Sequence, residues 1–161
     1  MNIFEIIKQQ ITEKGLTVAS FDFDRPWGGF FVIDEEQAQA FGNAYFEGLN
    51  VEKLRLAGKL SPKILVVKPG ARLSWQYHHR RAETWRVIQG PVGIITSQDD
   101  NERSIVRCEE GTTLVLYKEE RHRLIGLNEW GVVAEFWQHT DVLNPSDEED
   151  IVRVQDDYSR K

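Results

Sequence analysis

The stretch GARLSWQYHHRRAETWRVIQG, residues 70–90, contains the pattern that decides the fold. Read as a strand, residues 73–78 place Gln76 and His78 on the same face, because side chains alternate along an extended chain. A tight turn at 79–82 then reverses the chain and brings Glu83 back beside them. The stretch therefore predicts two antiparallel strands with an amide, an imidazole and a carboxylate on one side.

From residue 62 onward the sequence consists of short β-like runs separated by turn residues. Such a pattern is typical of an antiparallel sandwich or barrel. The predicted strands are 63–68, 73–78, 83–89, 92–97, 104–108, 112–117, 122–125 and 132–139. Eight strands with short connections favour an all-β jelly roll, in which the strand at 122–125 delivers His122 to the other three polar side chains.

Outside this region the sequence predicts additions to the barrel. Helices are expected at 2–14 and 35–46, with a strand at 27–33 between them and a docking strand at 151–154. We divide the chain into N-terminal helices and strand (1–60), a barrel core (61–143) and a C-terminal docking segment (144–161). At 161 residues, these parts are expected to form one domain.

Composition narrows the function classes. The chain has 20 Lys and Arg against 26 Asp and Glu, a net charge of −6, which opposes binding to nucleic acid or an anionic membrane. No apolar run approaches the roughly 20 residues that span a bilayer, and residues 1–10 do not resemble a secretory signal. Cys108 is the only cysteine, so no internal disulfide or cysteine-based zinc cluster can form. We expect a cytoplasmic protein.

Gln76, His78, Glu83 and His122 together form a candidate metal site. Two imidazoles, a carboxylate and an amide oxygen suit one divalent ion, and we expect Zn²⁺, with Fe²⁺ and Mn²⁺ as alternatives. Each residue alone is as well explained as an ordinary polar residue of a hairpin. Their combination favours the metal.

The spacing of these residues resembles a known family pattern. Gly70, five residues, Gln76, one residue, His78, four residues, Glu83, six residues and Gly90 resemble the first cupin motif, with Gln in place of its first His. A second cupin motif matches at Gly111 and His122, although Tyr-Lys-Glu at 117–119 stands where Pro-x-Gly is usual.

Five segments together, at 25–33, 68–85, 122–124, 134–138 and 149–160, resemble the cupin domain of type II mannose-6-phosphate isomerases. The resemblance implies a jelly-roll β-barrel and a metal-dependent interconversion of mannose 6-phosphate and fructose 6-phosphate through a cis-enediol. Members are often fused to a nucleotidyltransferase domain, for which 161 residues leave no room, so we expect no pyrophosphorylase activity. The helix at 2–14 and the insertion at 35–58 depart from the family.

The resemblance also implies roles for further residues. Lys68, Arg123 and Arg153 fall in matched segments and suit phosphate contacts, and Arg25 in the RPWG segment is expected in the pocket wall. Solvent-facing charge is the alternative for Lys68, Arg123 and Arg153.

Two residues are assigned to the chemistry itself. Arg81 has the strand parity to face the metal, and Glu135 is the first candidate for the base, ahead of His139 on the same strand face. A structural ion pair with a barrel arginine is the alternative for Glu135.

Two other functions are alternatives: a non-catalytic sugar-binding or regulatory cupin, and an iron-dependent oxygenase. The expected partner is a small sugar phosphate, and a homodimer is the default assembly for a jelly roll.

Overall fold

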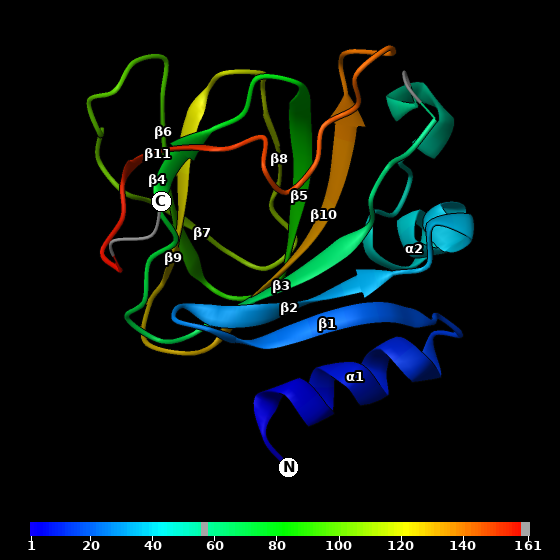
Figure 1. Cartoon of the computed structure of the whole chain (residues 1–161). Helices are drawn as coiled ribbons and strands as arrows, with labels where there is room; N and C mark the ends of the chain where they lie inside the picture. Colours follow the sequence, from blue (N-terminus) through cyan, green and yellow to red (C-terminus); the bar gives the residue numbers. More distant parts are fainter. Residues whose placement is uncertain (56–57, 159–161) are drawn as a thin grey trace.

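Two antiparallel sheets form the body of the protein (Figure 1). The computed structural model describes residues 1–55 and 58–158. The six-stranded sheet contains, in spatial order, β1 (Val18–Arg25), β2 (Gly28–Ile33), β3 (Lys63–Val67), β10 (Gly131–His139), β5 (Arg81–Gln89) and β8 (Thr113–Leu116). The five-stranded sheet contains β11 (Val152–Gln155), β4 (Trp75–Tyr77), β9 (Arg121–Gly126), β6 (Val92–Ser97) and β7 (Val106–Cys108). The predicted all-β barrel is confirmed.

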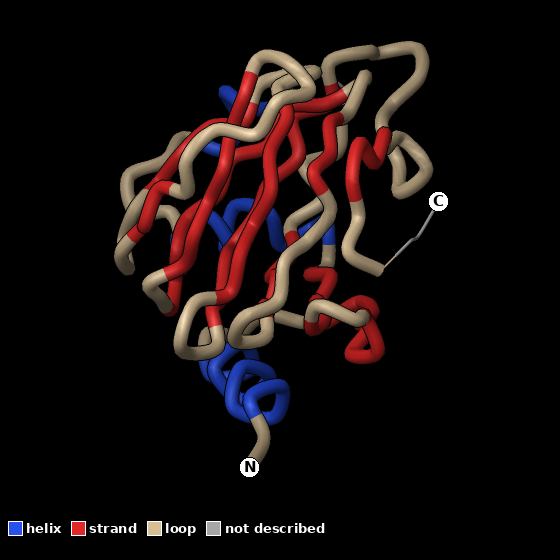
Figure 2. The backbone as a smooth tube through the Cα atoms, turned by 90° about the vertical axis from the view of Figure 1, so that its left-hand side faces the viewer, coloured by secondary structure: helices blue, strands red, loops and turns tan. Residues whose placement is uncertain are grey.

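The helices cover the outer face of the six-stranded sheet. Helix α1 (Ile3–Glu13) begins at a capping box in which Asn2 and Glu5 satisfy each other's backbone N–H groups, and it buries Ile7 and Ile11. The predicted helix at 35–46 is a 3-10 turn (Glu35–Gln37) followed by α2 (Ala38–Tyr45), and a second 3-10 turn spans Val51–Leu54. Figure 2, turned by 90°, shows α1 lying outside the strands near the N-terminus.

Strand alternation separates two apolar cores. Ile64 and Val66 of β3 face outward and pack with the helices. Leu65 and Val67, the alternate residues, face the interior of the barrel and pack with Val133 of β10. One end of the interior is therefore apolar, whereas polar side chains occupy the other end.

The structure differs from the prediction mainly at the sheet edges. β1 was not predicted: it lies at the edge of its sheet and leaves Phe21 59% exposed, so its alternation of Phe and Asp is only partly a burial pattern. The docking strand is present as β11, and it pairs with β4 so that Arg153 lies opposite Gln76. Residues 56–57 of the 35–58 insertion, and 159–160 of the segment 149–160, lie outside the described residues.

No helix in the described part of the chain is both long and apolar enough to cross a membrane.

Candidate metal centre

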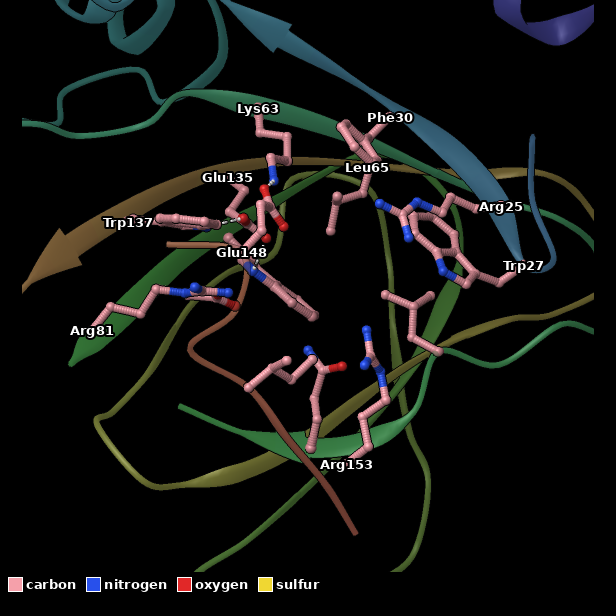
Figure 3. Close-up of a pocket in the computed structure, with 15 residues that line it drawn as sticks. Arg25, Trp27, Phe30, Lys63, Leu65, Arg81, Glu135, Trp137, Glu148 and Arg153 are labelled. Carbon is pink, nitrogen blue, oxygen red and sulfur yellow. Dashed lines mark hydrogen bonds and ion pairs between the residues drawn. The ribbon is translucent and has the colours of Figure 1, made fainter. Parts of the chain in front are cut away.

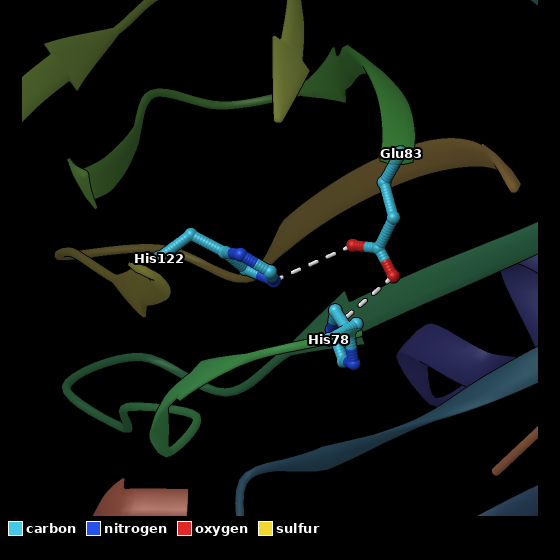
Figure 4. A group of neighbouring side chains, drawn as sticks. All are labelled: His78, Glu83 and His122. Atoms are coloured by element: carbon cyan, nitrogen blue, oxygen red, sulfur yellow. Dashed lines mark ion pairs between the residues drawn. The ribbon is translucent and has the colours of Figure 1, made fainter. Parts of the chain in front are cut away.

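His78, Glu83 and His122 converge inside the polar end of the barrel (Figure 4). Each comes from a different element, since His78 follows β4, Glu83 lies in β5 and His122 lies in β9. The Nε2 atoms of His78 and His122 lie 3.5 Å and 3.4 Å from the two carboxylate oxygens of Glu83. All three side chains are about 2% exposed. Groups far apart in the sequence thus form one compact donor set.

Backbone carbonyls orient both imidazoles. Nδ1 of His78 lies 2.7 Å from the carbonyl oxygen of Asp150, and Nδ1 of His122 lies 3.2 Å from that of Glu120. Because a carbonyl only accepts hydrogen bonds, each Nδ1 carries the proton and each Nε2 presents its lone pair toward Glu83. Burial lowers the pKa of His78 to about 3, so its ring is neutral at pH 7. This is the tautomer that metal binding requires.

Gln76 completes the set. Its Nε2 lies 3.5 Å and 3.4 Å from Nε2 of His78 and His122, and its Oε1 accepts a hydrogen bond from Ser74 Oγ at 2.6 Å. A half-turn of the amide would exchange Nε2 and Oε1, and the Ser74 hydroxyl could then accept instead of donate. The residues therefore fit a divalent ion held by two neutral imidazoles, a carboxylate and an amide oxygen.

Arg81 borders this centre, as its strand parity predicted. Its Nε donates to Glu83 at 2.8 Å, and its guanidinium lies 3.6 Å from the ring centroid of Trp137. Burial by itself raises the pKa of Glu83, but the charge of Arg81 holds that pKa well below its usual value. Glu83 is therefore ionised and ready to accept a cation.

Glu135, the predicted base, is 4% exposed and lies on the same inner face. It accepts hydrogen bonds from the indole N–H groups of Trp85 and Trp137. Burial, followed by the charge of Glu83, raises the pKa of Glu135 to about 7. A carboxyl group with such a pKa can exchange protons near neutral pH.

His139, the lesser candidate for the base, has both ring nitrogens engaged. Nε2 lies 3.2 Å from Ser61 Oγ, and Nδ1 accepts a hydrogen bond from the backbone N–H of Ser146. These contacts tie β10 to the segments on either side of it and do not support a role for His139 in proton transfer.

A cavity of about 170 Å³ is lined by Gln76 and Glu83 of the donor set together with Arg81 and Glu135 (Figure 3). Figure 3 shows Arg25, from β1, and Arg153, from β11, extending toward the cavity from opposite walls. The lining residues that bear charge or polar groups are Arg25, Lys63, Gln76, Arg81, Glu83, Glu135, Glu148 and Arg153.

Two of the three predicted phosphate ligands do not line the cavity. Arg123 is fully buried on the opposite face of β9 from His122, where its guanidinium donates to Leu73 O, Glu102 and Gln155. Lys68 is exposed in the turn that follows β3. Of the predicted phosphate ligands, Arg153 lines the cavity, and so does Arg25 of the expected pocket wall. Arg123 directly follows His122, so the two side chains point to opposite faces of the strand. This alternation was the signal in the sequence against a role for Arg123 in the cavity.

Sequence reasoning missed Lys63, which lines the cavity and is 5% exposed. It shares strand parity with Leu65 and Val67, whose apolar side chains mark the inner face of β3. That parity could have selected Lys63 in place of Lys68.

The unusual turn before His122 keeps its geometry. Glu119, at the position where the motif has Gly, adopts a φ of 64°, and its backbone N–H donates to His78 O at 2.9 Å. The replacement of Pro-x-Gly by Tyr-Lys-Glu therefore leaves His122 aimed at Glu83.

Comparisons with known proteins identify the family of this barrel. Residues 43–156 match the family described as Mannose-6-phosphate isomerase C-terminal. The xanthan biosynthesis protein XanB of Xanthomonas campestris is 28% identical over 136 residues, which are 84% of this chain and 23% of XanB. The alginate biosynthesis protein AlgA of Pseudomonas aeruginosa is 34% identical over 70 residues, 44% of this chain and 10% of AlgA.

Among solved structures, the capsular polysaccharide assembling protein CapF of Staphylococcus aureus aligns with a TM-score of 0.55 at 14% identity. The alignment covers 87% of this chain and 34% of CapF, and it bears on the fold alone. The chain thus corresponds to a minor part of each of these longer proteins. With a family match over residues 43–156, this cupin-type barrel belongs to the mannose-6-phosphate isomerase C-terminal family.

Proposed function

We propose that this protein is a metal-dependent aldose–ketose isomerase of a sugar phosphate, with mannose 6-phosphate and fructose 6-phosphate as the pair to test first. One observation carries the proposal: two members of the donor set, Gln76 and Glu83, line the same cavity as a carboxyl group with a pKa of about 7 and two arginines. An isomerase needs these three elements to polarise a carbonyl, move a proton on carbon and hold a phosphate.

The divalent ion would be held by Gln76, His78, Glu83 and His122. There it would supply a Lewis acid for the carbonyl and hydroxyl oxygens at C1 and C2 of the sugar. Arg25 and Arg153 would bind the phosphate, because a guanidinium makes paired hydrogen bonds to phosphate oxygens. Binding at both ends orients the open-chain sugar along the cavity.

Glu135 would transfer the proton on carbon. It pairs with Trp85, two residues along β5 from Glu83, a displacement of about 7 Å along the strand. Its carboxylate removes the proton from C2, and the electron pair forms the C1–C2 double bond of the enediol. The Glu135 carboxyl group exchanges its proton with solvent and then delivers a proton to C1, while the O2 proton is lost and O1 gains one. The two indole N–H donors hold the carboxylate in one orientation, and Arg81 stabilises negative charge on the enediol oxygens.

The test is to incubate metal-loaded protein with mannose 6-phosphate in D₂O and to follow the ketose and deuterium at C2 by NMR. We expect both signals, and we expect neither in Glu135→Gln with the same metal content. Absence of turnover and of exchange in the unmodified, metal-loaded protein would reject the isomerase for this sugar.

A non-catalytic sugar-phosphate-binding function is the second candidate. It is favoured by the engagement of both Glu135 oxygens with indole N–H groups, which reduces their basicity. Calorimetric binding of mannose 6-phosphate without exchange in D₂O would select this function over the isomerase.

A further inference from the structure

Lys63 is a buried cation in the cavity wall with an unusual partner. Its Nζ lies 2.6 Å from Oε1 of Glu148. The lysine side chain is 7% exposed, whereas that of Glu148 is 64% exposed. A buried ammonium needs a counter-charge. Here that charge comes from an exposed side chain of the segment that follows β10, and not from the barrel wall (Figure 3).

Two aromatic rings hold the ammonium in place. Lys63 Nζ lies 4.7 Å from the ring centroids of both Phe30 and Trp137. Cation–π contacts of this kind fix a cation without neutralising it, so the charge stays available to an anion. The ammonium position is therefore set by the barrel whether or not Glu148 is present.

The site is separate from the two arginines. Arg25 also contacts the Phe30 ring, at 5.4 Å from its centroid, and Figure 3 shows this ring between Arg25 and Lys63. Lys63 instead lies beside the proposed base, since its Cα pairs with that of Glu135 across β3 and β10. An anion bound at Lys63 would lie at a different place from one bound by the arginines.

Glu148 can leave Lys63 without moving its segment. Before it, Ser146 N–H donates to His139 and the Asp147 carbonyl accepts from Arg81. After it, the Asp150 carboxylate accepts from the backbone N–H groups of residues 79 and 80. Rotation of the Glu148 side chain alone would therefore free the ammonium while these anchors remain.

We propose that Lys63 is an anion-binding subsite for an oxyanion of the ligand, phosphate or carboxylate, and that Glu148 is a built-in competitor which the ligand displaces. The inference rests on the proposed sugar-phosphate function of the cavity and adds a second anion position to it. Ligand binding then includes an exchange of one carboxylate for another anion on the same ammonium.

The test compares binding by isothermal titration calorimetry at pH 7.5, with inorganic phosphate, mannose 6-phosphate and glucuronate as probes. Glu148→Gln removes the competing charge and keeps the side-chain size, so we expect affinity for at least one probe to rise roughly tenfold. Lys63→Met should lower the same affinity by about tenfold, and the double variant should behave like Lys63→Met. The probe that gains identifies phosphate or carboxylate as the group bound.

Glu149→Gln is the matched control, because Glu149 is exposed beside Glu148 and the substitution changes the net charge equally. An equal gain in Glu149→Gln, or no gain with any probe in Glu148→Gln, would overturn the subsite. Glu148→Gln alone decides this if Lys63→Met fails to fold. Since no turnover is measured, failure of the isomerase assay leaves this result readable by itself.

Discussion

The metal-ligand end and the cationic end of the cavity differ in how their side chains are held. At the metal end, His78 and His122 are buried and each is oriented by a backbone carbonyl. At the cationic end, Arg25 pairs with Asp22 at 3.1 Å while both side chains are about one-third exposed, 35% and 37%. Lys63 likewise relies on the exposed Glu148.

This difference separates a preorganised site from an exchangeable one. Buried ligands with fixed tautomers need no rearrangement to take up an ion. Cations neutralised by exposed acids must exchange partners when an anionic ligand arrives. We therefore expect substitutions at the metal end to act on metal content, and substitutions at the cationic end to act on ligand affinity alone.

The largest effect is expected between the two ends, at Glu135. Glu135→Gln should lower kcat about 10²–10⁴-fold, the usual contribution of a general base, while metal content is unchanged. With a pKa of about 7, the unmodified protein should gain activity as pH rises through neutrality, because the base works deprotonated. A bound cation lowers the pKa of Glu135 and so moves this midpoint to lower pH. Steady-state rates between pH 5 and pH 9 measure both effects, and a pH-independent rate would argue against Glu135.

His78→Ala should reduce metal affinity by more than about 100-fold, since loss of an outer partner alone costs 10–100-fold. Metal analysis after dialysis against Zn²⁺ measures it. His79→Ala is the matched control, because His79 is exposed and pairs with Glu119 outside the centre. Stoichiometric metal in His78→Ala would show that the ligand set is different.

Asp150→Asn tests the preorganisation directly. The Asp150 carboxylate accepts hydrogen bonds from Ser146 Oγ and from the backbone of residues 79 and 80, and its own carbonyl orients His78. Loss of some of these hydrogen bonds should weaken Zn²⁺ binding about 10-fold, as for other outer-sphere partners. Competition with a chelating dye measures the affinity, with the exposed neighbour Glu149→Gln as the control.

The Asp150 carboxyl group should also make the stability of the fold depend on pH in the acid range. Burial raises the pKa of Asp150, but its hydrogen bonds outweigh this and hold the pKa below the usual 3.8. A depressed pKa stabilises the fold above the unfolded-state value, and that contribution disappears as pH falls below it. Metal-free Asp150→Asn should therefore lose less stability than the unmodified protein between pH 5 and pH 2 in thermal unfolding.

The smallest effect is expected at the cationic end. Arg153→Met should raise KM for mannose 6-phosphate about tenfold, the lower range for a charge-assisted hydrogen bond, because Arg25 shares the phosphate. Metal content and kcat should change little. Arg86→Met, which removes an arginine outside the cavity, controls for net charge. A loss of metal in Arg153→Met would erase the proposed contrast between the two ends.

Strand periodicity accounts for most of what could be predicted. It placed Gln76 and His78 on one face and brought Glu83 and Glu135 to the same interior, because alternation depends only on local backbone geometry. In β3 and β9, charge and position in the matched segments favour Lys68 and Arg123, whereas strand alternation favours Lys63 and disfavours Arg123.

β1 shows a different limit. Its Phe21 and Phe23 alternate with Asp22 and Asp24, yet the strand lies at a sheet edge and its apolar face is only partly covered by α1. Edge strands carry weaker burial patterns, so periodicity by itself separates them poorly from loops. The position of Arg25, at the end of this strand, became clear only with the fold.

The sequence by itself determined the all-β class, the family resemblance and the candidate ligands Gln76, His78, Glu83 and His122, since these follow from spacing and alternation over short distances. Only the tertiary structure decided which cations face the cavity, that the Asp150 carbonyl orients His78, and that Glu148 occupies Lys63. These contacts join residues 72 and 85 positions apart. No local pattern encodes them, because they depend on how the segment after β10 folds back across the barrel.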